Sequence, residues 1–162
     1  LGMMEKILLT RAGYEQLMRE LELLSQVERP QIVRELLEAA QEGRVERNAD
    51  FQTALAQRQK LDRRIRQLQQ ILANAEVLVG SNVDPNQVRF NSRVRVVNNA
   101  TQKEYEYRLV GPVEADASRG LISNASPLGR ALMDRAPGDL VQVKTPKGSS
   151  SYRILEIHRD EI

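Results

Sequence analysis

Residues 43–51, which read Gly-Arg-Val-Glu-Arg-Asn-Ala-Asp-Phe, form a short charged segment between two long amphipathic stretches. This break predicts a helical hairpin whose tip carries Arg44 and Arg47. A guanidinium stays protonated in proteins and only donates hydrogen bonds, so these side chains can bind phosphates or carboxylates but cannot ligate Mg²⁺. Glu46 lies between them, and one carboxylate flanked by two cations is a poor metal site. Asn48 and Asp50 complete the candidate tip site.

Residues 10–75 have the periodicity of two helices. Pro30 lies inside the first helix and should kink it, because its ring removes a hydrogen bond and crowds the preceding turn. The first helix is expected to have Thr10 as N-cap, Gly43 as its stop, and an apolar stripe of Leu17, Leu21, Leu24, Val33, Leu36 and Ala40. The second has a coiled-coil seam interrupted by one arginine: Phe51, Ala54, Arg58, Leu61, Ile65, Leu68, Leu72 and Ala75. Two helices joined by a turn this short must lie antiparallel.

Beyond Gly80 the apolar residues recur with period two, which predicts half-buried strands. The alternating positions are Val88, Phe90, Val94, Val96, Tyr105, Tyr107 and Leu109. Ser126-Pro127 predicts the start of a short helix, with Ser as N-cap and Pro at the first position. We therefore expect an α+β chain, with a coiled-coil hairpin domain over residues 3–79 and a β-rich domain with one short helix over residues 80–162.

The composition excludes several classes of function. The net charge of +2 is too small for binding duplex DNA by bulk electrostatics. Two Phe, four Tyr and no Trp are too few aromatic residues to favour a base-stacking platform. The absence of Cys excludes disulfides and thiolate metal sites and suits a reducing cytoplasm. No apolar run reaches the roughly 18 residues of a membrane span. We expect a cytoplasmic monomer with no membrane contact.

No self-contained active site is visible in the sequence. Residues 145–148, Thr-Pro-Lys-Gly, lack the spacing of a phosphate-binding loop and are expected to form a surface turn. His158 is the only histidine and has no nucleophile signature nearby. The hairpin acids alternate with arginines, as on a solvated helix face. We therefore expect no enzyme activity, no cofactor and no resident metal.

The whole chain from about Leu8 resembles the Gre family of bacterial transcript cleavage factors. The segment Ser126-Pro-Leu-Gly-Arg-Ala-Leu132 is the most specific part of this resemblance. The tip and the turn at residues 145–148 add to it, as do Leu9-Thr10, Arg29-Pro30 and Glu38-Ala39.

This resemblance implies a partner and a mechanism. In the family, a β-rich domain similar in fold to FKBP docks on the rim of the RNA polymerase secondary channel, and the hairpin enters the channel. Two tip carboxylates help to hold a second Mg²⁺ that activates water to cut backtracked RNA. Carried over to this chain, the expected polymerase-binding residues are Ser126, Pro127, Leu128 and Arg130. Nucleic acid would be met only inside the polymerase complex.

The chain departs from the family pattern at the tip. The family reads Gly-Asp-Leu-x-Glu-Asn-Ala-Glu-Tyr there, so Arg44 and Arg47 occupy both carboxylate positions. The two positions matched to the family's basic patch hold Ala40 and Leu55, and Arg58, one turn further on, is the candidate RNA-facing substitute. The arginines could be mere exposed residues of a diverged paralogue. Against that interpretation, Arg47 begins the second helix, where the helix dipole disfavours a cation.

The resemblance, together with the changed tip, leads us to expect a regulator that binds bacterial RNA polymerase at the secondary channel and inhibits or pauses transcription without stimulating RNA cleavage. One alternative is an ordinary cleavage-stimulating elongation factor in which Glu42, Glu46 or Asp50 takes the acidic role. An alternative of another class is a coiled-coil adaptor with no polymerase contact.

Overall fold

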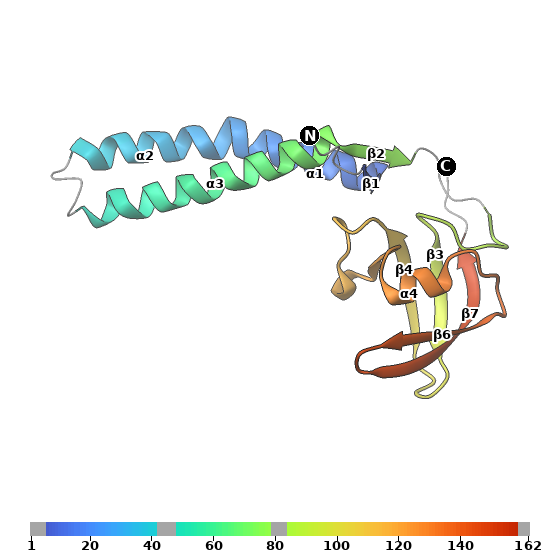
Figure 1. The fold of residues 1–162 in the computed structure, drawn as a ribbon. Coiled ribbons are helices and arrows are strands. Elements are labelled where there is room, and N and C mark those ends of the chain that lie inside the picture. Colours follow the sequence, from blue (N-terminus) through green and yellow to red (C-terminus); the bar gives the residue numbers. More distant parts are fainter. Residues whose placement is uncertain (1–5, 42–47, 79–83, 159–162) are drawn as a thin grey trace, which may run out of the picture. The chain divides into compact units, whose positions relative to one another are not determined.

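The computed structural model describes residues 6–41, 48–78 and 84–158 (Figure 1). The chain separates into two compact units, one containing Ala12–Ala75 and the other containing Ile7–Arg11 and the chain from Glu76 onward. The first is a helical hairpin and the second is a β-rich unit with one short α-helix. The α+β fold class predicted from the sequence is therefore confirmed. The domain boundary placed between residues 79 and 80 stays a prediction.

Within residues 11–41 and 49–73, the hairpin comprises three α-helices and one π-helical turn. Its first arm comprises α1 (Arg11–Leu23), the π-turn η1 (Leu24–Glu28) and α2 (Arg29–Gln41), and its second arm is α3 (Ala49–Ala73). The irregularity expected at Pro30 is present as η1, directly before α2. Proline cannot donate to the preceding turn, and a π-turn accommodates that break by inserting one extra residue. The expected stop at Gly43 lies outside the described residues.

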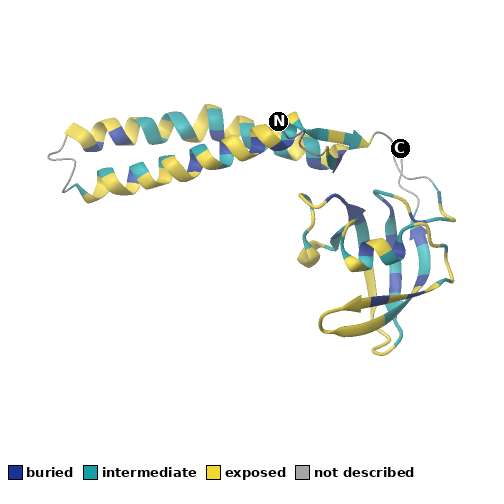
Figure 2. Ribbon diagram, viewed as in Figure 1, coloured by how far each residue is buried: buried dark blue, intermediate teal, exposed yellow. Residues whose placement is uncertain are grey.

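The two arms of the hairpin bury one narrow stripe of side chains between them, while their outer faces are exposed (Figure 2). On α3 the buried residues are Ala54, Leu61, Ile65, Leu68 and Ile71. Leu61, Ile65 and Leu68 form a cluster with Leu24, against which Leu17, Leu21 and Ile32 pack.

Two positions of the predicted seam were wrong. Ala39 is buried where Ala40 was expected, because the extra residue of η1 shifts the phase of α2. Ile71 is buried where Leu72 was expected, since a helix of 3.6 residues per turn drifts away from a strict 3.5 repeat.

A two-stranded sheet that the sequence analysis missed joins β1 (Ile7–Thr10) to β2 (Ala75–Leu78). Ala75, assigned to the second helix, belongs to β2, because α3 ends at Ala73 and Asn74 is its C-cap. Thr10 precedes α1 as predicted, but it ends a strand.

The β-rich unit contains a five-stranded sheet with the order β5-β4-β3-β7-β6. Its elements are β3 (Arg93–Asn98), β4 (Glu104–Val110), the 3-10 turn η3 (Ala117–Arg119), β5 (Leu121–Ser123), α4 (Pro127–Leu132), β6 (Leu140–Thr145) and β7 (Gly148–His158). All pairings are antiparallel except β4–β5. The predicted turn at residues 145–148 joins β6 to β7.

One core holds this unit together. Buried side chains from the sheet pack with Leu132 of α4: Val94, Val96, Leu109, Ile122, Val141, Ile154 and Ile157, with Val88. The strand predicted at Val88 and Phe90 was wrong. Val88 is instead fixed in an irregular segment, where its N–H donates to Arg135 O (2.8 Å) and its carbonyl accepts from Asp134 N (2.9 Å).

Candidate functional site

The base of the hairpin tip is closed by Asn48, the N-cap of α3. Its Oδ1 accepts a hydrogen bond from Phe51 N (3.1 Å), and its backbone is extended, as a cap residue requires. Its Nδ2 donates to the carbonyl oxygen of Ala39 on α2. One side chain therefore caps the second arm and ties it to the first, which is a structural role for this member of the predicted tip site.

Asp50 lies in the first turn of α3 and is exposed. A carboxylate is stabilised there by the helix dipole. The other predicted tip residues, Arg44, Glu46 and Arg47, lie outside the described residues, so the structure brings together only Asn48 and Asp50 from that set.

Arg58 belongs to an ion-pair cluster on the hairpin. Its Nε lies 3.7 Å from Oδ2 of Asp62, whose Oδ1 accepts a hydrogen bond from Nε of Arg29 on the other arm (3.0 Å). Two guanidinium groups thus share one carboxylate and leave a local excess of one positive charge. The Arg58 side chain remains 39% exposed, which leaves donors able to reach an anion.

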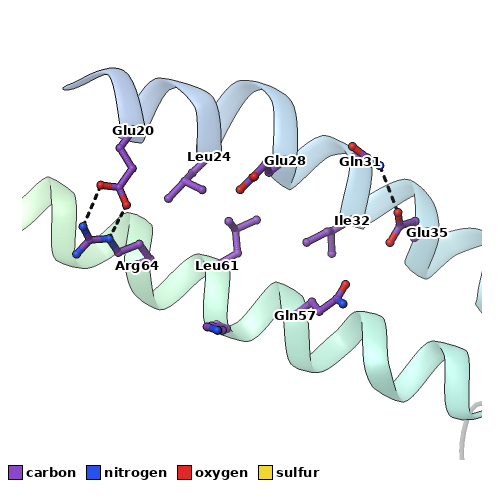
Figure 3. A pocket seen from close by; sticks show the side chains of 10 residues that line it. Glu20, Leu24, Glu28, Gln31, Ile32, Glu35, Gln57, Leu61 and Arg64 are labelled. Atoms are coloured by element: carbon purple, nitrogen blue, oxygen red, sulfur yellow. Dashed lines mark hydrogen bonds and ion pairs between the residues drawn. The ribbon is translucent and has the colours of Figure 1, made fainter. Parts of the chain in front are cut away.

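A cavity of about 460 Å³ lies between the two arms beside the π-turn. Leu24, Ile32 and Leu61 point into it from opposite arms (Figure 3). The Glu20 carboxylate closes one end through Arg64, with Oε1–Nε at 2.8 Å and Oε2–Nη2 at 2.9 Å. This hydrogen-bonded carboxylate raises the pKa of Arg64 above its usual value.

A second cavity of about 320 Å³ continues toward the tip and shares Glu35 and Gln57 with the first. Its other lining residues are Glu38, Ala39, Asp50, Thr53 and Ala54. We call the two adjoining cavities the hairpin groove. The sequence analysis missed it, because the acids had been assigned to a solvated helix face.

The segment from Ser126 to Arg130 begins α4 as predicted. Ser126 is the N-cap, with Oγ accepting from Gly129 N (3.0 Å) and donating to Ser123 O (2.7 Å). Pro127 and Arg130 are exposed, whereas Leu128 is partly buried against the core. The four predicted docking residues therefore lie together, with the apolar ring of Pro127 and the charged side chain of Arg130 exposed.

Gly129 is required at its position in α4 because there is no space for a side chain. A Cβ at this position would lie 2.0 Å from the Ser123 carbonyl oxygen and 3.0 Å from Asn124 Cα. No side chain fits there, so the loop after β5 and the first turn of α4 pack backbone to backbone.

The strand β1 is fastened by a residue that sequence reasoning missed. Glu114 accepts two hydrogen bonds from Thr10, at 2.8 Å from the backbone N and 2.5 Å from Oγ1. Leu9 is fully buried, and Gly111 passes so close to Leu8 that a Cβ there would lie 2.0 Å from the Leu8 carbonyl oxygen. No sequence signal links Thr10 to Glu114, which lies 104 residues further along the chain.

Charged side chains alternate with core residues on β3, β4 and β7. Arg95 contacts Glu104 (3.1 Å) and Glu156 (3.3 Å), and Glu156 contacts Nε2 of His158 (3.1 Å). His158 is thus a strand residue within an ion-pair network. Such partly exposed pairs contribute little stability each.

Among residues 6–41, 48–78 and 84–158, no group of three or more His, Cys, Asp or Glu side chains is arranged to hold a metal ion. Within the same ranges, every helix is too short or too polar to cross a membrane.

Comparison with known proteins identifies relatives over almost the whole chain. The family "Transcription elongation factor, N-terminal" matches residues 7–77, and "Transcription elongation factor, GreA/GreB, C-term" matches residues 81–159. The transcription elongation factor GreA of Paracoccus denitrificans is 40% identical over 95% of this chain and 98% of its own length. GreA of Helicobacter pylori strain Shi470 is 38% identical over 98% of this chain and 97% of its own. The crystal structure of GreA factor homolog 1 (Gfh1) of Thermus thermophilus is 29% identical, covers 95% of this chain and 99% of its own, and has a TM-score of 0.41.

Proposed function

Because this chain belongs to the GreA/GreB family of transcription elongation factors, we propose that it binds bacterial RNA polymerase at the secondary channel and restrains transcription without stimulating RNA cleavage. The reacting groups in this proposal belong to the polymerase, and the chain acts on them as a regulator. Its cytoplasmic location and monomeric state are part of the same proposal.

The observation that carries the proposal is the pair Arg44 and Arg47. The family resemblance places two carboxylates at these positions to hold a second Mg²⁺. A guanidinium has no lone pair to offer a metal, so a tip with these two residues lacks both ligands. The same groups bind phosphates and carboxylates, which surround a polymerase active centre. Such a tip is suited to occupying the centre and competing with its normal ligands.

The described residues on either side of the tip segment also support the proposal. Asn48 joins the start of α3 to the Ala39 carbonyl oxygen of α2, so the two ends of the tip segment are held together. The Arg29–Asp62–Arg58 cluster adds positive charge on the hairpin, consistent with Arg58 as the RNA-facing residue.

The docking part of the proposal assigns polymerase binding to the surface around Ser126, Pro127, Leu128 and Arg130. An exposed proline and an exposed arginine on a capped turn are suited to a protein contact, since little backbone order has to be gained on binding.

The test uses backtracked elongation complexes of bacterial RNA polymerase supplied with Mg²⁺ and the full chain. RNA shortening and RNA extension are followed in the same reactions. We expect slower extension with no accelerated shortening. Efficient shortening would instead establish the ordinary cleavage-stimulating factor, with Glu42, Glu46 or Asp50 as the acidic group. No binding and no effect on either reaction would favour an adaptor without polymerase contact.

A further inference from the structure

The hairpin groove is lined by one edge of each arm. On the first arm the lining residues recur at helical spacing through Glu28, Gln31, Ile32, Glu35, Glu38 and Ala39. On α3 they recur in the same way through Asp50, Thr53, Ala54, Gln57, Lys60, Leu61 and Arg64. Residues three and four apart share a helix face, so both arms present a continuous strip to the groove. From Glu28 to Glu38 the strip is about 15 Å long, at 1.5 Å per residue.

The groove lies beside the π-turn η1 (Leu24–Glu28) and is open to solvent between the two arms. Its apolar floor is narrow, because Leu24 and Leu61 are each only 9% exposed and Ile32 is partly buried. A third helix packed over the two arms would cover the rest of this floor together with its polar rims.

The rim of the groove is acidic although the chain as a whole carries +2. Five carboxylates line it, from Glu20, Glu28, Glu35, Glu38 and Asp50, against the two cations Lys60 and Arg64, a net charge of −3. Arg64 is already bound to Glu20. The excess negative charge therefore lies at Glu28, Glu35, Glu38 and Asp50, and the first three share the edge of the first arm with Ile32.

We propose that the hairpin groove binds a cationic amphipathic helix of a partner protein. One or two aliphatic side chains of that helix enter between Leu24, Ile32 and Leu61. Its Lys or Arg side chains, one turn to either side, pair with Glu28, Glu35 and Glu38. This interaction is separate from the tip and from the α4 surface, and it does not depend on the proposed effect on transcription.

The geometry favours a helix over other occupants. The groove presents no strand edge to which an extended peptide could add by backbone hydrogen bonds. Its carboxylates repel nucleic acid. An amphipathic helix presents apolar side chains three and four residues apart. The lining residues of both arms have the same spacing, so such a helix can lie along the groove.

The test measures fluorescence anisotropy of a labelled synthetic helical peptide, with Leu on one face and Arg on its flanks, titrated with the full chain. A matched peptide has Glu in place of every Arg. The decisive variant is Glu35→Lys with Glu38→Lys, and its control is Glu22→Lys with Glu76→Lys. The control changes the charge equally at exposed acids outside the groove. A third variant, Ile32→Ala, removes part of the apolar surface of the groove without changing its charge.

We expect the native chain and the control to bind the Arg peptide alike, and the Glu35/Glu38 variant to bind it about tenfold more weakly. Ile32→Ala should also weaken binding, and the Glu peptide should not bind. Helical circular dichroism verifies that each variant is folded. If the variant Glu35→Lys with Glu38→Lys is unfolded, the binding measured for Ile32→Ala tests the proposal. No binding by the native chain, or equal loss in the control, would overturn the proposal.

Discussion

The side-chain amide of Asn48 donates a hydrogen bond to the backbone carbonyl oxygen of Ala39, across the two arms of the hairpin. Because Asn48 also caps α3 through Phe51 N, a single residue fixes where the second arm begins and how far it lies from the first. The residues between Ala39 and Asn48 include the two arginines on which the functional proposal rests. The two arms of the hairpin are thus joined by a polar contact directly beside the segment that carries these arginines.

Replacing Asn48 with Ala removes both hydrogen bonds. Loss of an N-cap costs about 0.5–2 kcal/mol, and the Ala39 carbonyl loses a partner as well. We expect thermal unfolding of the hairpin, followed by helical circular dichroism, to shift to lower temperature. Asn86→Ala, at an exposed position in the other unit, is the control and should leave that transition unchanged. An identical melting curve for Asn48→Ala would contradict the role assigned to this residue.

Substitutions at Gly129 and Arg130 test the stability of α4 and its proposed docking role separately. Gly129→Ala forces a Cβ against the Ser123 carbonyl oxygen, a strain of about 1–3 kcal/mol, and should lower the stability of the β-rich unit in chemical denaturation. Arg130→Ala changes an exposed side chain and should alter stability by under about 0.5 kcal/mol. It should nevertheless weaken binding to core RNA polymerase several-fold. Unchanged affinity for Arg130→Ala would remove this residue from the proposed interface.

The Thr10–Glu114 contact has a stability consequence of its own. Glu114→Ala removes both side-chain oxygens, so the two hydrogen bonds from Thr10 are lost, at a cost of about 1–3 kcal/mol. Glu104→Ala is the matched control, because its partner Arg95 lies in an exposed ion pair worth at most about 1 kcal/mol. Denaturant unfolding should rank Glu114→Ala as clearly less stable. The reverse ranking would show that β1 is held mainly by the burial of Leu9.

The sequence predicted the elements that have a long and regular pattern. The repeat in α3 and the Ser-Pro start of α4 were sufficient to place both helices. The short strands β1, β2 and β5 were missed, because a segment of three or four residues is too short for its pattern to distinguish a strand from a helix or a loop. The phase of α2 was wrong at Ala40, because no sequence rule says whether a proline bends a helix or inserts a π-turn.

The candidate site was predictable only in part. Ser126 and Asn48 follow local capping rules, and their partners Gly129 and Phe51 lie three residues away. The hairpin groove and the Thr10–Glu114 contact depend on residues that are distant in the chain. Their positions follow from packing, which a single sequence does not encode locally.

Arg44 and Arg47 should carry the regulatory effect without carrying the affinity. They belong to the tip, and α3 alone separates Ala49 from Ala73 by about 37 Å. The double change to Ala should therefore leave affinity for core polymerase within a few-fold while abolishing inhibition of nucleotide addition. The measurement is RNA extension rate against protein concentration. Equal inhibition by native and double-Ala proteins would mean that occupying the channel is sufficient for inhibition and that the two arginines do not contribute to it.

The two tip arginines are proposed to leave this family member unable to support RNA cleavage, and a single assay compares their effect with that of the family's acids. Native protein and the variant Arg44→Asp with Arg47→Glu are added to the same backtracked elongation complexes with Mg²⁺, and RNA shortening is timed. We expect background cleavage with the native chain and accelerated, though partial, cleavage with the variant, since Ala40 and Leu55 do not supply the family's basic patch. Rapid cleavage by the native chain, unchanged by the double substitution, would overturn the proposal.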